Sequence, residues 1–349
     1  MIYLRAIISG GGTGGHIYPA ISIAKELITT ENAEILFVGT ADGMERELVA
    51  QAGLNFSSLD VRGLDRKISL SNIVTVIKAI NAIWQARRLL RSFRPDIVIG
   101  TGGYVCGPIL MAASLMGIPT LIQEQNVFPG LTNRILARFA DKIALGYAEA
   151  EEYFSDPHKA VCTGNPVRAA VIEATREEGL EFTGLKADRL TLLVVGGSRG
   201  ARSINTAMLS VHKYFSGNKG IQILHITGEK EYNSVVNQLQ ADEINIETDN
   251  IHIKPYLHNM PAALAVADLA VFRAGAIGLA ELTVRGIPSI LIPYPHAAEN
   301  HQEYNARALQ EHGAALMIKD AQLSGEVLID NINRLIDDKD ALARMAQAA

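Results

Sequence analysis

The sequence has few cysteines and no segment that would direct it to, or anchor it in, a membrane. Its 349 residues include only two cysteines, Cys106 and Cys162, which argues against a disulfide framework and favours a reducing compartment. The N-terminal residues lead straight into an expected strand, without the basic region and cleavage site of a signal peptide. No apolar run reaches the ~18 residues that a transmembrane helix needs. We therefore expect a cytoplasmic protein, soluble or bound peripherally to a membrane.

The sequence also has a small net charge and few patterns that are typical of metal binding. The net charge of −5 and the pI of about 6.0 give no support for nucleic-acid binding. No Gly-Lys-Ser/Thr occurs, which excludes a P-loop NTPase. The one Asp-x-Asp, at 338–340, lies in a charged stretch that predicts a solvated helix end, and the histidines show no metal-ligand spacing. We expect neither a metal requirement nor a nucleic-acid partner.

Short apolar runs alternate with segments of helical periodicity, such as 20–29 and 73–91. Continuous apolar strands interleaved with helices are typical of parallel sheets whose two faces are both covered. The fold class predicted is therefore α/β, with doubly wound sheets. The expected strands are 5–8, 34–38, 96–99, 120–122, 142–145, 190–195, 221–226, 251–254, 269–272 and 289–292.

The alternation begins again at Leu190, which indicates two domains, as the chain length also does. The charged segment 173–189 has no expected strand and is the candidate linker, with a break at 164–166 just before it. We predict two Rossmann-like domains, 1–167 and 168–349. Ligands of such sheets bind at the carboxyl ends of the strands, so an interdomain cleft is the expected active site.

Three expected strands end in glycine-rich turns, at 10–15, 100–103 and 196–200. Glycine lets backbone N–H groups approach a ligand closely, and the N-terminus of a following helix stabilises an anion. One such loop can be no more than a tight turn, but three loops in two halves favour a pyrophosphate or sugar phosphate. The first loop also fits a dinucleotide fingerprint. However, the second strand ends without the acidic residue that holds the ribose in dehydrogenases, and Asp42 comes late.

His16 follows the first glycine loop directly and should lie at the start of a helix. The positive end of a helix dipole favours a neutral imidazole, which is the form that a general base requires. His16 is therefore the candidate base, and a structural capping histidine is the alternative.

Several segments, taken together and in order, match the motifs of one family. They are 11–19, 102–108, 124–126, 130–133, 164–168, 196–202, 273–281, Pro293, 301–302 and 305–306. Across nearly the whole chain, this combination resembles glycosyltransferase family 28, which has the two-domain GT-B fold. The resemblance implies an inverting transfer of N-acetylglucosamine from UDP-N-acetylglucosamine (UDP-GlcNAc) to the 4-hydroxyl of the muramyl pentapeptide of lipid I. The product would be lipid II, for peptidoglycan synthesis, cell shape and cell division.

The resemblance also implies the site residues. His16 is the expected base, with Glu124 and Tyr104 as weaker alternatives. An N-terminal acceptor-binding domain and a C-terminal donor-binding domain are implied, with no cofactor. The residues expected at the substrates are Thr13, Gly14, Gly15, Asn126, Arg168, Ser198, Leu257, Ala276, Ile277, Gly278, Leu279, Ala280, Glu281, His301 and Gln302. Asn126 should hold the N-acetylglucosamine, and Glu281 should accept hydrogen bonds from the ribose.

Two positions depart from the common family pattern: Gly278 stands where a residue with a hydroxyl is frequent, and Cys106 where serine or alanine is frequent. The family pattern also continues with a further helix after 345–349. We therefore expect this sequence to be a piece of a longer chain or one with a short tail.

A basic, amphipathic helix is the expected contact with the cytoplasmic face of the membrane. Its apolar face would hold Ile73, Val76, Ile77, Ile80 and Trp84. Basic residues surround these positions in the sequence: Arg62, Arg66, Lys67, Lys78, Arg87, Arg88, Arg91 and Arg94. Such a helix binds an anionic interface, but it equally fits a core helix with a basic solvent face. The resemblance further implies contacts with other proteins of cell-wall synthesis.

Other functions stay open on the residues alone. One is another GT-B transferase that uses a UDP-sugar and a lipid acceptor. A second is a non-catalytic nucleotide-sugar-binding protein, which the presence of both His16 and Glu281 disfavours. A dehydrogenase or epimerase that uses NAD would need a Tyr-x₃-Lys pair, and none is found.

Overall fold

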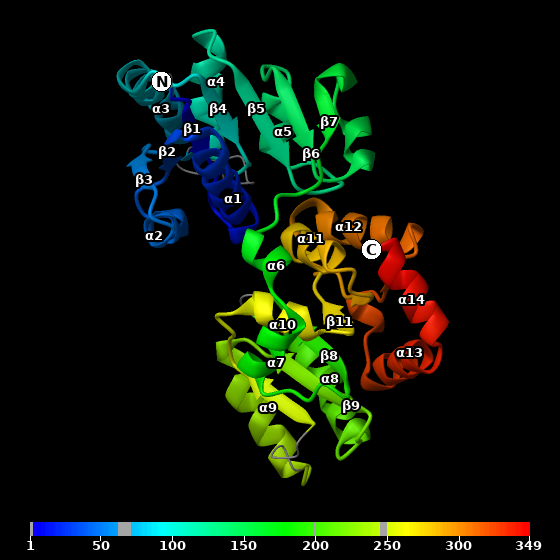
Figure 1. The fold of residues 1–349 in the computed structure, drawn as a ribbon. Helices are drawn as coiled ribbons and strands as arrows, with labels where there is room; N and C mark the ends of the chain where they lie inside the picture. Colours follow the sequence, from blue (N-terminus) through cyan, green and yellow to red (C-terminus); the bar gives the residue numbers. More distant parts are fainter. Residues whose placement is uncertain (1–2, 62–70, 198–199, 245–249) are drawn as a thin grey trace. The chain divides into compact units, whose positions relative to one another are not determined.

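The computed structural model describes residues 3–61, 71–197, 200–244 and 250–349 (Figure 1). These form two compact units, Met1–Pro166 and Val167–Ala349. Each unit holds one parallel sheet with helices on both faces.

The first unit contains a seven-stranded sheet in the order β3-β2-β1-β4-β5-β6-β7. Its strands are β1 (Arg5–Ser9), β2 (Glu34–Gly39), β3 (Asn55–Ser58), β4 (Ile97–Gly100), β5 (Thr120–Glu124), β6 (Lys142–Leu145) and β7 (Ala160–Cys162). Its helices are α1 (Gly14–Glu31), α2 (Met44–Gln51), α3 (Ser71–Phe93), α4 (Cys106–Leu115) and α5 (Leu131–Leu136).

Residues of β1 alternate between the two faces of this sheet, as the period of two in a strand requires. Ala6 and Ile8 pack with α1 and α2, whereas Ile7 packs with α3, α4 and α5. All three are fully buried, which explains the continuous apolar run in the sequence. Full burial of one such aliphatic side chain contributes about 1.5–3 kcal/mol.

The second unit contains a six-stranded sheet in the order β10-β9-β8-β11-β12-β13. Its strands are β8 (Leu190–Val195), β9 (Ile221–Ile226), β10 (Ile251–Lys254), β11 (Leu269–Phe272), β12 (Ser289–Leu291) and β13 (Ala315–Met317). Its helices are α6 (Ala169–Glu173), α7 (Arg176–Thr183), α8 (Arg202–Phe215), α9 (Glu229–Ala241), α10 (Met260–Val266), α11 (Ala276–Val284), α12 (His301–Glu311), α13 (Gly325–Asp337) and α14 (Lys339–Ala348).

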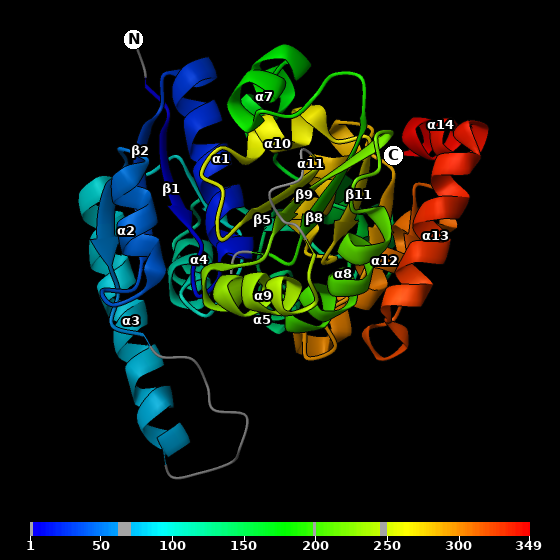
Figure 2. The same cartoon turned by 90° about the horizontal axis from the view of Figure 1, so that it is seen from below.

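Helices cover this second sheet on both faces too. Leu192 and Val194 of β8 pack with α8, α13 and α14, whereas Leu193 and Val195 pack with α6, α10 and α11. Figure 2 shows α7 and α10 on one side of β8 and β9, with α8 and α9 on the other. The α/β fold predicted from the sequence is confirmed.

The strand order reverses next to the first strand of each sheet. In the first unit β1 lies between β2 and β4, and in the second β8 lies between β9 and β11. The connections on either side of such a switch point run to opposite faces, which opens a crevice where ligands bind. All three glycine-rich loops follow these strands, namely β1, β4 and β8.

The candidate linker at 173–189 is a wrong prediction, because most of that segment is part of the second unit. Thr175 and Glu178 form a capping box at the start of α7. A Cβ atom at Gly179 would overlap α10, so the two helices touch closely. Half of the charged residues that suggested a linker lie on α7, where Arg176 pairs with Asp268 at 3.1 Å.

Two buried histidines lie between α8 and β9. His212 Nε2 and His225 Nδ1 are 3.0 Å apart, and His225 Nε2 is 3.0 Å from Asn205 Oδ1. Asn205 uses its amide nitrogen to donate to the Thr227 carbonyl oxygen, so its oxygen must accept from His225. Neutral His225 then has its lone pair on Nδ1, and His212 donates to it. The chain of hydrogen bonds is complete only while His225 is neutral. His212 Nδ1 is buried and has no hydrogen-bond partner among the described residues, so a second proton on that ring would have no acceptor.

Acid should therefore destabilise the second unit. Burial lowers the pKa of His212 to about 4 and that of His225 well below its usual value. The unfolded chain binds these protons near pH 6.5 and the folded chain does not. Each histidine thus removes roughly 2 kcal/mol of stability between pH 7.5 and 5. Urea unfolding at the two pH values, followed by pulsed hydrogen exchange of β8 and β9, measures this loss.

The matched variants are His212→Gln and His258→Gln, since His258 is exposed in the same unit. We expect the first to reduce the pH dependence by about 2 kcal/mol and the second to leave it unchanged. Equal pH dependence in both variants would contradict the assignment.

Candidate active site

The first two glycine loops touch each other at the switch point of the first unit. Gly11 N donates to the Gly102 carbonyl oxygen at 3.3 Å. Gly103 has φ +85°, and a Cβ atom there would overlap the Gly11 carbonyl, so the position requires glycine. Cys106 Sγ donates to Gly102 O at 2.9 Å, a contact that suits a donor side chain at this position.

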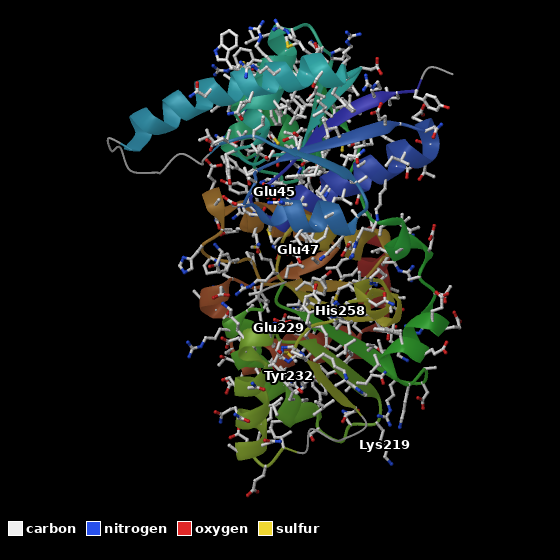
Figure 3. The ribbon with its side chains drawn as sticks, turned by 90° about the vertical axis from the view of Figure 1, so that its left-hand side faces the viewer. Glu45, Glu47, Lys219, Glu229, Tyr232 and His258 are labelled. Carbon is white, nitrogen blue, oxygen red and sulfur yellow. The ribbon has the colours of Figure 1, made fainter. Side chains whose placement is uncertain are left out.

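Glu45, at the start of α2, fastens the first loop to the end of β2. Its Oε1 accepts from Thr40 N at 2.9 Å and from Thr40 Oγ1 at 2.6 Å, and its Oε2 accepts from Gly12 N at 3.4 Å. The side chain is fully buried. Glu47, two residues along the same helix, is exposed, and Figure 3 labels both.

His16 is the third residue of α1, and Thr13 is its N-cap. Its Nδ1 lies 3.0 Å from the Thr101 carbonyl oxygen and 3.0 Å from Gln125 Oε1. Thr13 and Gly15 beside it are exposed, so this end of the helix can meet a ligand. The geometry thus offers an imidazole and free backbone N–H groups at one point.

Glu124, at the end of β5, has both carboxylate oxygens occupied. Oε1 accepts from the backbone and side-chain nitrogens of Asn126, and Oε2 accepts from Gly130 N and Asn133 Nδ2. Only 1% of Glu124 is exposed. The carboxylate therefore holds the loop after β5, and Asn126 is directed toward it.

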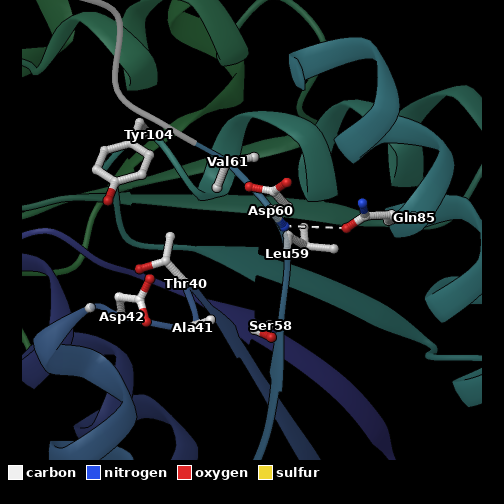
Figure 4. Close-up of a pocket in the computed structure, with 10 residues that line it drawn as sticks. Thr40, Ala41, Asp42, Ser58, Leu59, Asp60, Val61, Gln85 and Tyr104 are labelled. Carbon is white, nitrogen blue, oxygen red and sulfur yellow. Dashed lines mark hydrogen bonds between the residues drawn. The ribbon is translucent and has the colours of Figure 1, made fainter. Parts of the chain in front are cut away.

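A pocket of about 430 Å³ opens beside Tyr104 (Figure 4). The Tyr104 ring lies against Gly12, so the pocket adjoins the first glycine loop. Asp60 N donates to Gln85 Oε1 at 3.2 Å across one wall. Polar groups dominate the lining, which comprises Thr40, Ala41, Asp42, Gly43, Ser58, Leu59, Asp60, Val61, Gln85 and Tyr104.

In the second unit, Arg168 and Glu281 pair with each other. Arg168 donates from Nε at 2.9 Å and from a terminal nitrogen at 2.7 Å, both to Glu281 Oε1. Glu281 is 8% exposed. Burial raises the pKa of its carboxyl, and the neighbouring guanidinium opposes that rise. None of the described residues donates a hydrogen bond to Oε2, so this oxygen is available to accept one from a ligand.

The starts of α11 and α12 lie near each other in this unit. Gln302 Nε2 is 3.9 Å from the Cβ position of Gly275, the N-cap of α11. Gln302 Oε1 accepts from Tyr294 N at 2.9 Å, and His301 Nδ1 lies 2.7 Å from the Ala298 carbonyl oxygen. The amide side chain of Gln302 therefore lies beside the start of α11.

Arg273, at the end of β11, is held inside the second unit. It donates to Asp320 Oδ1 at 2.6 Å and to Ser203 Oγ at 2.8 Å. The side chain is 11% exposed. The hydrogen bond to Ser203 joins the end of β11 to the start of α8, across the switch point of the second sheet.

The sequence patterns of two domains match most of the chain. The glycosyltransferase family 28 N-terminal domain matches residues 6–145, and the family 28 C-terminal domain matches residues 191–349. The chain belongs to glycosyltransferase family 28. It is a glycosyltransferase, and its two Rossmann-like units are those of the GT-B fold.

Curated relatives match this chain over nearly its full length and most of their own. A protein of Desulforamulus reducens is 51% identical over 99% of this chain and 94% of its own. One from Desulfitobacterium hafniense strain Y51 is 50% identical with the same coverage. Both are named UDP-N-acetylglucosamine–N-acetylmuramyl-(pentapeptide) pyrophosphoryl-undecaprenol N-acetylglucosamine transferase. The crystal structure of Acinetobacter baumannii MurG is 28% identical, with a TM-score of 0.76 over 99% of this chain and 95% of that one.

In this family 28 chain, the structure brings together three sets of predicted site residues, two in the first unit and one in the second. In the first unit, Thr13, Gly14, Gly15, His16 and Tyr104 gather around the first glycine loop, and Asn126 and Glu124 bond to each other. In the second unit, Arg168 meets Glu281, whereas Leu279 is fully buried in the core, and its N–H donates to the Gly275 carbonyl oxygen. Ser198 lies outside the described residues.

Other predicted residues of the second unit lie at strand ends and helix starts. Leu257 is half-buried after β10, and α11 carries Ala276, Ile277, Gly278 and Ala280 in its first turns. In the described parts of the chain, no three histidine, cysteine, aspartate or glutamate side chains come together as a metal site. Glu45 was not predicted from the sequence. No role was predicted for Gln125, although it lies inside a recognised motif.

Glu45 should stabilise the first unit much more than Glu47 does. Glu45→Ala leaves the two buried donors of Thr40 without their acceptor, and each unsatisfied group costs about 1–3 kcal/mol; it also removes the longer bond from Gly12 N. We expect a loss of at least that size in the free energy of unfolding, measured with urea. Glu47→Ala, at an exposed site, should change it by less than about 0.5 kcal/mol. Similar values for both variants would contradict the role given to Glu45.

Proposed function

We propose that the protein transfers N-acetylglucosamine from UDP-GlcNAc to the 4-hydroxyl of the N-acetylmuramyl pentapeptide of lipid I, giving lipid II. The observation that carries the substrates is the identity of about half of all residues, over nearly full length, with enzymes named for this reaction. Peptidoglycan synthesis is the corresponding pathway. The N-terminal unit would bind the acceptor and the C-terminal unit the donor.

In this proposal His16 is the general base. The acceptor hydroxyl loses its proton to the imidazole while its oxygen attacks the anomeric carbon from the side opposite UDP. The C–O bond to UDP breaks in the same displacement, which inverts the anomeric centre. Tyr104 lies one loop away and would contact the acceptor. Glu124 is committed to the loop after β5 and suits a supporting role.

The donor is assigned to the second unit. Glu281 Oε2 would accept a hydrogen bond from the ribose, and Arg168 would meet the negative charge of the diphosphate. The first turn of α11 and the third glycine loop supply N–H groups for the phosphates, as helix N-termini do. Gln302 and His301 would bind the sugar. No metal is part of this proposal, so EDTA should leave the rate unchanged.

The pocket beside Tyr104 is proposed to take a polar part of the acceptor. Its lining offers the hydroxyl groups of Thr40, Ser58 and Tyr104 and the carboxylates of Asp42 and Asp60. Such groups hydrogen-bond sugar hydroxyls or peptide N–H groups. The pocket adjoins the loop that carries His16, which suits the acceptor side of the reaction.

Transfer of labelled N-acetylglucosamine from UDP-GlcNAc to a lipid I analogue tests the function. His16→Ala should lower kcat by roughly 10²–10⁴-fold, the usual contribution of a general base, with little effect on the donor KM. Glu281→Ala should mainly raise the donor KM, by on the order of 10- to 100-fold, because a hydrogen bond to a charged group is lost. His158→Ala, an exposed histidine of the first unit, is the control.

Normal turnover by His16→Ala would contradict the base assignment. Equal use of UDP-glucose or UDP-galactose would contradict the donor. Turnover on diacylglycerol but not on the lipid I analogue would indicate another GT-B transferase with a lipid acceptor. Donor binding without any transfer would indicate a non-catalytic binding protein.

We also propose that α3 binds the cytoplasmic face of the membrane. Trp84, which is 60% exposed, Arg88 and Arg91 are spaced three and four residues apart, so they share one exposed face of α3. The other apolar positions of this prediction, at 73–80, and the basic ones at 62–78 lie outside the residues whose side chains are described. None of the described helices is long and apolar enough to cross a bilayer.

Vesicle sedimentation tests this second proposal. Each basic residue near an anionic surface contributes about 1 kcal/mol, so Arg88→Ala with Arg91→Ala should weaken binding by on the order of 30-fold. The loss should shrink at high salt and on neutral vesicles. Lys219→Ala with Lys230→Ala, at exposed sites of the second unit, is the matched control. Equal binding by both double variants would contradict the proposal.

A further inference from the structure

The hydrogen bonds of His16 determine which of its nitrogens carries the proton. Thr101 O and Gln125 Oε1 both lie 3.0 Å from Nδ1, and both are oxygens of carbonyl type, which only accept. Nδ1 must therefore carry a hydrogen. In the neutral ring the lone pair is then on Nε2, to which no described residue forms a hydrogen bond.

The direction of the Gln125 amide is itself fixed. Gln125 Nε2 donates to Thr101 O at 2.7 Å and to Gln123 O at 2.9 Å. A flipped amide would place its oxygen against these two acceptors and its nitrogen against the Nδ1 hydrogen. Only 1% of Gln125 is exposed, so water does not replace either set of bonds.

We infer that Gln125 is a positioning residue, which holds His16 in the tautomer whose Nε2 can take a proton from the acceptor. The inference rests on the proposed function. The Thr101 carbonyl oxygen also receives the Gln125 amide hydrogens, so Gln125 Oε1 is the acceptor committed to the imidazole alone. A neutral amide sets the tautomer without the negative charge that would stabilise a protonated ring.

The surrounding backbone confines the ring in the same orientation. A Cβ atom at Gly102 would lie 2.6 Å from His16 Nδ1, so the imidazole packs directly on that glycine. Thr101 Oγ1 donates to the His16 carbonyl oxygen at 2.7 Å and fixes the main chain. The ring therefore has little freedom to exchange its two nitrogens.

Other ionisable groups lie on the elements packed around the ring. They are Glu45 of α2, Tyr104 and Cys106 at the start of α4, and Glu124 of β5. In the described structure none of them forms a hydrogen bond with His16, and the oxygens of both carboxylates are engaged elsewhere. Gln125 is thus the side chain that contacts the base.

Three variants test the inference. Gln125→Leu removes, at similar volume, the side-chain acceptor of the His16 Nδ1 hydrogen, and Gln125→Glu replaces it with a carboxylate. Gln222→Leu changes a buried glutamine of the second unit, whose side chain bonds Lys186 and Thr191 and neither Gln125 nor His16. The measurements are the nitrogen-15 NMR spectrum of His16, which reports the tautomer, and the pH profile of kcat/KM.

We expect Gln125→Leu to lose the excess of the Nδ1–H form and to lower kcat at least tenfold, with the donor KM unchanged. Gln125→Glu should move the rising limb of the pH profile upward by about one unit or more, since a nearby carboxylate stabilises the imidazolium. Gln222→Leu should retain the tautomer and the pH midpoint of the wild type.

The inference is overturned if His16 keeps the Nδ1–H form in Gln125→Leu, or if activity falls equally in all three variants with one pH midpoint. Failure of the proposed function is a separate result, because it would appear as absent transfer in the wild type. The NMR spectrum still reports the tautomer in that case.

Discussion

The parallel pairing of β1 with β4 is the constraint on which the site of the first unit depends. Because these strands run side by side in one direction, their carboxyl ends deliver two glycine loops to the same edge of the sheet. The loops approach closely enough that Gly103 lies on the Gly11 carbonyl. The same pairing brings Thr101 and Gly102 onto the ring of His16. In the second unit, β8 and β11 repeat the arrangement and present the starts of α8 and α11.

Much of this architecture could be predicted from the sequence, because strands buried on both faces leave continuous apolar runs. Five expected strands, including 190–195 and 269–272, have the bounds that were predicted. The structure adds β3, β7 and β13, which are only three or four residues long and partly exposed. Short edge strands bury too little apolar surface to leave a pattern. The charged stretch at 173–189 was misinterpreted because one solvated helix face resembles a linker in composition.

The site was predictable to the extent that residue type alone indicates chemistry. His16 follows a glycine loop and Glu281 lies in a recognised motif, so both could be named. Nothing in the sequence shows that Glu281 pairs with Arg168, 113 residues away. Nor does it show that the carboxylate of Glu124 accepts four hydrogen bonds from the residues that follow β5. Glu45 could not be predicted for the same reason, because its role as a hydrogen-bond acceptor depends on where Thr40 and Gly12 lie in the folded chain. Contacts between distant segments are a property of packing, and periodicity does not encode them.

The hydrogen bonds around Gln125 extend beyond His16. Gln123 Nε2 donates to Asn165 Oδ1 at 3.0 Å, and Asn165 Nδ2 donates to the Gln125 carbonyl oxygen at 2.9 Å. Asn165 is the residue before Pro166, where the first unit ends. Groups that share one network do not contribute independently, so the effect of replacing one depends on which partners are present. His16, Gln123, Gln125 and Asn165 therefore form one coupled network, in which the effect of a substitution at one position depends on the residues at the other three.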